Sequence, residues 1–161
     1  MIETIEWDNY FLNLLPHISK KSKDTTKTSA IIVGPDHAIR STGYNGMPRG
    51  FNDLDLNKWE KPEKYYWVEH AERNAIYNAS RMGTSTYGCT MYASHFPCVD
   101  CARGIVQSGI LRVVLMKENL HHFRHQTSKY FEHENKTIEI FNSCGVMFDI
   151  LPLNVDNEWA V

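Results

Sequence analysis

Two short stretches, His70-Ala71-Glu72 and Pro97-Cys98-Val99-Asp100-Cys101, constrain the fold of this chain more than any other feature. Neutral imidazole and thiolate sulfur are ligands that a tetrahedral zinc ion prefers. His70, Cys98 and Cys101 supply three such ligands. Three protein ligands leave one position open, which is the usual count for a catalytic zinc, whereas a structural zinc normally has four. A fold that forms this site must bring together two stretches that lie far apart in the sequence.

The spacing of His70 and Glu72 predicts where a helix begins. Residues two apart lie on roughly opposite faces of a helix. These two side chains can therefore reach one ion only if both lie in the first turn of the helix. We therefore expect a helix over residues 69–82, beginning near Glu69 or His70. Glu72 is then the candidate proton shuttle beside the metal.

The two cysteines predict a second helix that starts at the same site. Cys98 and Cys101 lie three apart and share one face of a helix expected over residues 98–108. Pro97 suits the start of that helix. Since the positive ends of both helix dipoles would point at the metal, we expect the pKa of both thiols to be lowered.

The order H-x-E followed by P-C-x-x-C is a known signature of zinc-dependent nucleobase deaminases. Zinc lowers the pKa of bound water from about 15.7 to roughly 7, so hydroxide becomes available at neutral pH. Hydroxide can add to a ring carbon that carries an exocyclic amine. Glu72 would take the water proton and pass it to the ring nitrogen and the leaving ammonia.

Composition indicates one ordinary globular domain. The chain has 161 residues, of which 42% are hydrophobic and 22% charged, values typical of a single soluble domain. The net charge of −2 favours a small-molecule substrate over long nucleic acid or a membrane surface. The chain shows no long apolar run and no signal-peptide pattern, so we expect a cytoplasmic protein. Residues 1–161 are expected to form one domain, with the tail from about residue 152 loosely held.

Hydrophobic periodicity predicts an α/β fold. Apolar residues recur at helical spacing over residues 7–18, where Pro16 predicts a kink or a break. A further helix is expected over residues 128–143. Strands are expected at residues 30–33, 38–43, 89–93, 112–116 and 146–151. Because the first two strands form a hairpin and helices separate the others, we expect a mixed five-stranded sheet, with an antiparallel hairpin leading into parallel strands.

Two motifs leave a choice open. Residues 51–67 show no clear period, and their final Tyr65-Tyr66-Trp67 either stacks on a base or packs in the core, with core packing favoured. The segment 117–126 is expected to be a polar loop. Its histidines could alternatively hold a second metal: His121, His122 and His125.

Three motifs together resemble the deoxycytidylate deaminase family of the cytidine deaminase superfamily. The first two are the histidine–glutamate stretch at residues 70–72 and Phe-Pro-Cys-Val-Asp-Cys at residues 96–101. The third is Gly43-Tyr44-Asn45-Gly46-Met47-Pro48-Arg49-Gly50, and this loop narrows the resemblance from the superfamily to the family. Ser22-Lys23-Asp24 matches as well. The similarity extends from about residue 7 to residue 151.

The resemblance implies a cytidine-deaminase-like three-layer α/β fold and the hydrolytic deamination of dCMP to dUMP and ammonia. It implies that His70, Cys98 and Cys101 hold Zn²⁺, with Glu72 as the acid–base residue. Asn45 is expected to contact the sugar. The remaining expected substrate contacts are Ser22, Lys23 and Lys27 at the 5′-phosphate, with Ala71 and Phe96 in the substrate site. Family members are often hexamers activated by dCTP and inhibited by dTTP. The resemblance therefore implies a possible allosteric loop, formed by Gly46, Met47, Pro48 and Arg49.

Departures from the family pattern keep alternatives open. The family commonly reads Ser-Lys-Asp-Pro and then Gln-Val-Gly-Ala, whereas this chain has Thr25 after the aspartate and then Lys27-Thr28-Ser29-Ala30. This difference lies in the stretch expected to contact the 5′-phosphate. The first alternative is therefore a deaminase of free deoxycytidine, or of both deoxycytidine and dCMP. A nucleic-acid-editing deaminase is disfavoured by the acidic balance. A non-catalytic zinc module is disfavoured because no fourth ligand is evident near Cys98.

Overall fold

The computed structural model describes residues 2–52, 55–119 and 128–153. Five strands of these residues form one sheet in the order β2-β1-β3-β4-β5. The strands are β1 (Ser29–Val33), β2 (Ile39–Tyr44), β3 (Thr90–Ala93), β4 (Arg112–Met116) and β5 (Met147–Leu151). Both β2 and β3 run antiparallel to β1, whereas β3, β4 and β5 are parallel to one another. The predicted mixed sheet is therefore confirmed.

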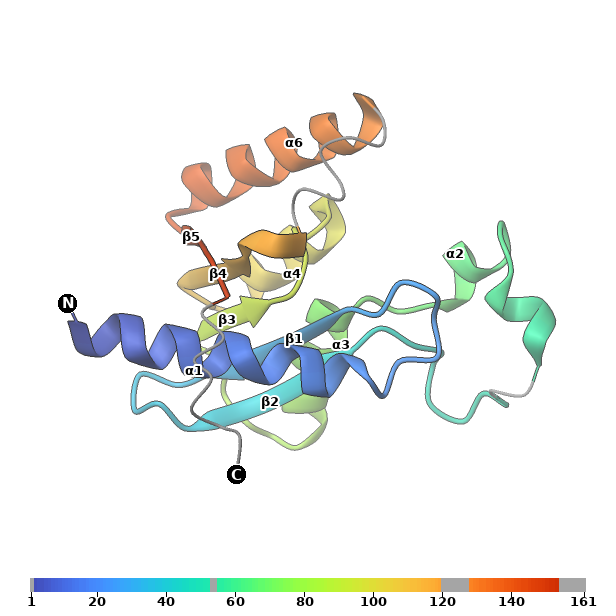
Figure 1. The fold of residues 1–161 in the computed structure, drawn as a ribbon, viewed down its shortest axis with the longest axis horizontal. Coiled ribbons are helices and arrows are strands. Elements are labelled where there is room, and N and C mark those ends of the chain that lie inside the picture. Colours follow the sequence, from blue (N-terminus) through green and yellow to red (C-terminus); the bar gives the residue numbers. More distant parts are fainter. Residues whose placement is uncertain (1, 53–54, 120–127, 154–161) are drawn as a thin grey trace.

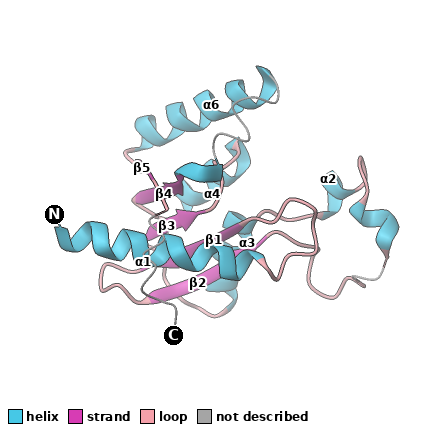
Figure 2. Cartoon of the chain, viewed as in Figure 1, coloured by secondary structure: helices cyan, strands magenta, loops and turns pink. Residues whose placement is uncertain are grey.

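Helices cover both faces of this sheet and give three layers (Figure 1; Figure 2). On one face lies α1 (Ile2–Ser19), which packs against the first four strands of the chain. The other face carries α3 (Ala71–Arg81) and α4 (Val99–Gln107), and α6 (Ser128–Cys144) packs beside α4. The helices that carry the two metal-ligand stretches thus lie side by side in the same layer.

The alternation of β1 explains how one sheet supports two cores. Ala30 and Ile32 point to the core beneath α3 and α4, whereas Ile31 and Val33 point to the core beneath α1. Successive side chains of a strand face opposite sides of the sheet, and all five residues of β1 are buried. A strand buried on both faces is apolar along its whole length, which is why this stretch is recognisable in the sequence.

The helix α1 continues through Pro16, so the predicted break is wrong. Proline removes one backbone donor and crowds the preceding turn, but Pro16 is only three residues from the helix end at Ser19. The Ser19 hydroxyl donates a hydrogen bond to the Pro16 carbonyl at 2.9 Å. Phe11 and Leu15 are fully buried in the core under this helix. Ile18, in the last turn, packs against the same core, and this contact stabilises the turn despite the lost donor.

The segment after β2 contains two short helices that the sequence did not reveal. A 3₁₀ helix, η1 (Leu56–Trp59), precedes α2 (Lys64–Trp67), and this part of the chain extends away from the sheet in Figure 1. Tyr65 and Tyr66 are 62% and 82% exposed, so core packing was the wrong prediction for these two side chains. Trp67 instead packs on Phe51, with ring centroids 5.0 Å apart. A four-residue helix that projects from the body cannot bury several rings.

The start of the C-terminal tail is held by the body of the protein. The Leu153 backbone N–H donates to both carboxylate oxygens of Glu118 at 3.0 Å, and its side chain packs against the core beneath α1. Residues 154–161 lie outside the described residues, and so do His121, His122 and His125. In the described ranges, no helix has the length and apolar character needed to cross a membrane.

Candidate active site

Three predicted metal ligands come together between the starts of α3 and α4. His70 is the N-cap of α3, and Cys98 is the N-cap of α4. The His70 Nδ1 atom lies 3.5 Å from the sulfur of Cys98 and 3.5 Å from that of Cys101, and the two sulfurs are 3.5 Å apart. Tetrahedral zinc, with Zn–S of about 2.3 Å and Zn–N of about 2.0 Å, separates its ligand atoms by roughly 3.5 to 3.8 Å. The three side chains therefore fit a zinc ion.

Backbone contacts fix the histidine half of this triangle. The Gly46 N–H donates to the Glu69 carbonyl at 3.1 Å, and the Glu69 N–H returns a bond to the Gly46 carbonyl at 2.8 Å. His70 follows directly. Beneath it, a Cβ at Gly43 would collide with the Ala71 carbonyl oxygen and the backbone nitrogen of Ala75. Glycine at this position lets β2 approach α3 closely, which places the start of α3 at the sheet edge.

Glu72 lies beside the ligand triangle in the first turn of α3. Its side chain is buried, and its Oε2 atom is 3.6 Å from the Cys101 sulfur. Burial raises the pKa of Glu72, because a charged carboxylate is poorly solvated there, while the nearby His70 opposes the shift. A carboxyl group with a raised pKa is suited to holding and releasing a proton during a reaction.

The pKa values of the two thiols shift in opposite directions, so Cys98 ionises before Cys101. The hydrogen bond between the two sulfurs, together with His70, lowers the pKa of Cys98 to about 3. The same hydrogen bond, together with burial, raises the pKa of Cys101. The prediction that both thiol pKa values are lowered is therefore right for Cys98 and wrong for Cys101. A metal ion that binds both sulfurs releases the remaining proton.

Arg73 is a site residue that the sequence analysis missed. Its Nη1 atom lies 3.5 Å from the Cys101 sulfur and 4.0 Å from the Cys98 sulfur. Its Nε donates to Glu69 Oε1 at 2.6 Å, an i,i+4 pair along the start of α3. The available signal was the position of Arg73, three residues after His70, which puts both on one helix face.

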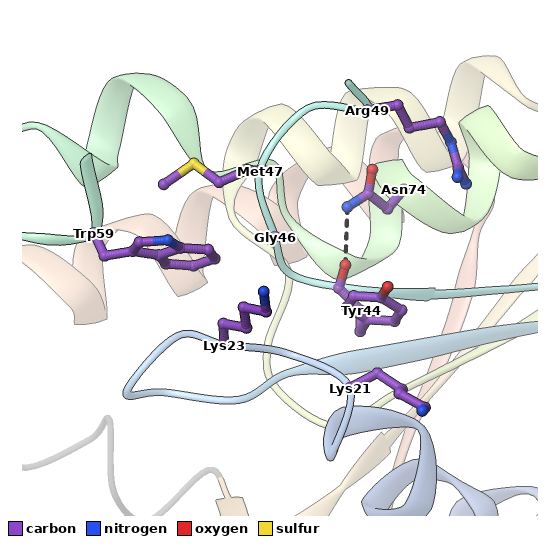
Figure 3. Close-up of a pocket in the computed structure, with 8 residues that line it drawn as sticks. All are labelled: Lys21, Lys23, Tyr44, Gly46, Met47, Arg49, Trp59 and Asn74. Carbon is purple, nitrogen blue, oxygen red and sulfur yellow. Dashed lines mark hydrogen bonds between the residues drawn. The ribbon is translucent and has the colours of Figure 1, made fainter. Parts of the chain in front are cut away.

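A cavity next to this site brings together residues that were predicted separately. Figure 3 shows Lys23 and Trp59 pointing toward the Gly46 backbone from two sides. The cavity is lined by Lys21, Lys23, Tyr44, Gly46, Met47, Arg49, Trp59 and Asn74. Ser22, Lys27 and Asn45 lie outside this set of described lining residues. Gly46, which lines the cavity, is hydrogen-bonded to Glu69, the residue before the metal ligand His70. This backbone pairing connects the cavity to the ligand triangle.

Asn45 fastens the loop that carries the lysines. Its Oδ1 atom accepts a hydrogen bond from the Thr28 N–H at 2.8 Å, and its Nδ2 donates to the Thr26 carbonyl at 2.8 Å. The side chain is buried. An amide oxygen accepts up to two hydrogen bonds and an amide nitrogen donates two, so one of each remains for a ligand.

The other predicted contacts differ in burial and in whether they line the cavity. Ser22 is buried, and its hydroxyl accepts a bond from the Asp24 N–H at 3.2 Å. Lys27 is exposed. Arg49 points along α3 and donates to the Asn78 side chain. These positions separate Lys23, which lines the cavity, from Lys27, which does not.

Two apolar residues flank the metal ligands. Ala71 is fully buried at the start of α3. Phe96 precedes Pro97 and packs edge-on against Phe148, with ring centroids 6.5 Å apart. The Pro97 carbonyl accepts a bond from the buried Thr137 hydroxyl of α6 at 3.0 Å, so α6 supports the cysteine stretch from behind.

Residues 5–117 match the family model for the cytidine and deoxycytidylate deaminase zinc-binding region. The chain belongs to this family. Deoxycytidylate deaminase of Homo sapiens is 36% identical over 151 residues, which cover 89% of this chain and 79% of the human protein. The mouse deoxycytidylate deaminase is 39% identical over 124 residues, covering 73% of this chain and 68% of that protein.

A solved structure agrees with these sequence relatives. The dCMP deaminase of the cyanophage S-TIM5, in complex with dCMP and dUMP, superimposes with a TM-score of 0.69 at 25% identity. The superposition covers 91% of this chain and 97% of the phage protein. The resemblance predicted from three motifs and the cytidine-deaminase-like fold are both confirmed. Zinc is the cofactor that the family and the ligand triangle support.

Proposed function

We propose that this chain catalyses the hydrolytic deamination of dCMP to dUMP and ammonia, with Zn²⁺ held by His70, Cys98 and Cys101. The observation that carries the proposal is the triangle of ligand atoms 3.5 Å apart with the buried Glu72 beside it. The names of the human, mouse and cyanophage relatives support dCMP as the substrate.

The protein residues have separate roles in this reaction. Zinc, when bound, supplies a Lewis acid that lowers the pKa of water to about 7. Glu72 holds and moves the protons at its Oε2 atom. It delivers one to the ring nitrogen beside the reacting carbon and one to the departing amine. Its burial keeps bulk water from competing for these protons. Ala71, which is fully buried, and Phe96 support the pyrimidine site from behind the ligands.

The cavity beside the triangle is the proposed place of the sugar phosphate. Lys23 is the phosphate contact, supported by its position toward Gly46 in the cavity (Figure 3). Asn45 uses its remaining donor and acceptor for the sugar while it holds the loop in place. Ser22 acts through the turn that it forms with Asp24. Lys27, being exposed, adds long-range attraction for the phosphate.

A second candidate activity, on free deoxycytidine, is favoured by one observation. Of the predicted phosphate residues Ser22, Lys23 and Lys27, only Lys23 lines the cavity. Two other cations line the cavity, but Arg49 donates to Asn78, and Lys21 points away from Gly46 in Figure 3. One hydrogen bond to a charged group contributes about 1.5–3 kcal/mol, so a single contact from Lys23 should favour dCMP by roughly 10- to 150-fold in kcat/KM. Measurable turnover of deoxycytidine is therefore expected as a side activity.

The test is a deamination assay over dCMP, deoxycytidine, CMP and dCTP with zinc-loaded protein. The proposal requires dCMP to have the highest kcat/KM. If deoxycytidine equals dCMP, the phosphate role is refuted. If none of the four loses ammonia while the protein retains zinc, the deaminase proposal itself is refuted.

The assembly and its regulation extend this proposal. We infer that residues 1–161 act as one catalytic domain, supported by the single sheet with a core on each face. The family resemblance supports a hexamer that responds to dCTP and dTTP through Gly46, Met47, Pro48 and Arg49. Analytical ultracentrifugation with and without dCTP tests the assembly, and dCMP kinetics with each triphosphate test the regulation.

A further inference from the structure

A buried ion pair joins two segments that are far apart in the sequence and that both reach the cavity. Lys64 Nζ lies 2.7 Å from Asp24 Oδ1. The side chains are 13% and 4% exposed, respectively, so water screens this pair far less than it screens the surface pairs of the molecule. Lys64 begins α2, and Asp24 lies in the loop between α1 and β1.

Asp24 organises the loop that presents Lys23. Its Oδ1 atom accepts bonds from the Thr26 N–H at 3.0 Å and from the Thr25 hydroxyl at 3.1 Å. Burial opposes ionisation of this carboxyl, but the hydrogen bonds from Lys64 and the Thr26 N–H hold its pKa below the usual value. The carboxylate is therefore charged at neutral pH and fixes the turn directly after Lys23.

Lys64 belongs to the segment that carries Trp59, which also lines the cavity. The Lys64 N–H donates to the Glu60 carbonyl at 2.9 Å, one residue after η1 ends at Trp59. Lys58 and Glu63 form an ion pair at 2.9 Å within the same segment. Residues 55–67 are thus linked internally, and Trp59 lies between Lys58 and Glu60, the two residues that make these contacts. In Figure 3 the Trp59 ring and the Lys23 side chain come from separate segments and both point toward the Gly46 backbone.

We propose that Asp24 and Lys64 form a positioning pair that holds residues 55–67 against the loop of Lys23 and thereby sets the affinity of the cavity for a nucleotide phosphate. This inference rests on the proposed function, because it takes Lys23 as the phosphate contact. Lys64 acts through Asp24 and not by touching the ligand, since its ammonium is engaged 2.7 Å from that carboxylate. Loss of the pair separates the Trp59 wall from the lysine wall.

The experiment measures steady-state kinetics of zinc-loaded Lys64→Met on dCMP and on deoxycytidine. The KM for dCMP should rise about tenfold, the lower end of the range for one charge-assisted contact, because Lys23 itself is retained. The kcat on dCMP, the zinc content and the kcat/KM on deoxycytidine should stay within twofold of wild type. Lys64→Arg keeps the positive charge next to Asp24 and should restore the KM.

Two further variants separate position from charge. Lys61→Met removes one positive charge from the same segment, where Lys61 is exposed and lies over the Tyr65 ring, and should leave the KM for dCMP unchanged. Asp24→Asn keeps an oxygen acceptor for the turn but loses the ion pair, and should raise the KM as Lys64→Met does. Thermal denaturation of each variant confirms that it is folded at the assay temperature.

The outcomes distinguish this inference from the function beneath it. If wild type does not distinguish dCMP from deoxycytidine, the phosphate site fails, and the positioning pair fails with it. If wild type does distinguish them, equal losses by Lys64→Met on both substrates show a general structural role and overturn the inference. An unchanged KM for dCMP in Lys64→Met and Asp24→Asn, or an equal rise in Lys61→Met, also overturns it.

Discussion

Replacing Arg73 by glutamine should weaken zinc binding without unfolding the protein. The Arg73 guanidinium is the cation that contacts the sulfurs of both Cys98 and Cys101. Its side chain is held by Glu69 at the partly buried rim of the site. Glutamine retains a polar side chain of similar reach but loses the charge and the planar set of donors.

The contact distances set the size of the expected effect. The 3.5 Å contact with Cys101 counts as one charge-assisted hydrogen bond to sulfur, and the 4.0 Å contact with Cys98 adds little. Such a bond contributes about 1.5–3 kcal/mol, and groups that support metal ligands typically change affinity by about 10- to 100-fold. Because the Arg73 side chain is 21% exposed, solvent weakens the contact. We therefore expect the zinc dissociation constant to rise about tenfold.

Competition with a chromophoric chelator measures this constant in wild type and Arg73→Gln. Arg103→Gln is the matched control, because Arg103 pairs with Asp100 on the outside of α4, where the side chains are 61% and 65% exposed. The control should bind zinc within twofold of wild type. An Arg73→Gln protein that also binds zinc within twofold of wild type would refute the reasoning, and so would an equal loss in both variants.

Three further outcomes follow from buried contacts. Glu72→Gln should retain zinc but lose about 10²- to 10⁴-fold in kcat, since glutamine cannot shuttle protons; a loss below tenfold would assign the proton transfer to another group. Asp8→Asn should lower the free energy of unfolding by about 3–5 kcal/mol in urea titrations, because the Asp8 carboxylate accepts one bond from Tyr92 and two from Arg112 at 2.7–2.9 Å; a change under about 1 kcal/mol contradicts this. Gly43→Ala should lower the melting temperature, because its methyl group meets the backbone of α3; an unchanged melting temperature would show that β2 and α3 separate freely.

The sequence by itself determined the metal chemistry and the order of the elements. The identities and spacing of His70, Cys98 and Cys101 specify a zinc triangle, because ligand type and helix periodicity are local properties. The mixed sheet followed in the same way, since a hairpin and intervening helices leave few allowed strand connections. Apolar strands such as β1 were recognisable because both of their faces are buried.

Only the tertiary structure decided which side chains surround that triangle. Arg73 reaches the cysteine sulfurs because α3 and α4 begin side by side. Its spacing from His70 places both residues on one helix face, but this spacing does not determine the distance to α4. The pairing of Asp24 with Lys64 likewise depends on how the segment 55–67 folds back. The Tyr65 and Tyr66 rings remain exposed, because aromatic residues become part of a core only where another element covers them. Spacing along the chain fixes which atoms share a helix face, whereas contacts between distant residues are fixed by packing.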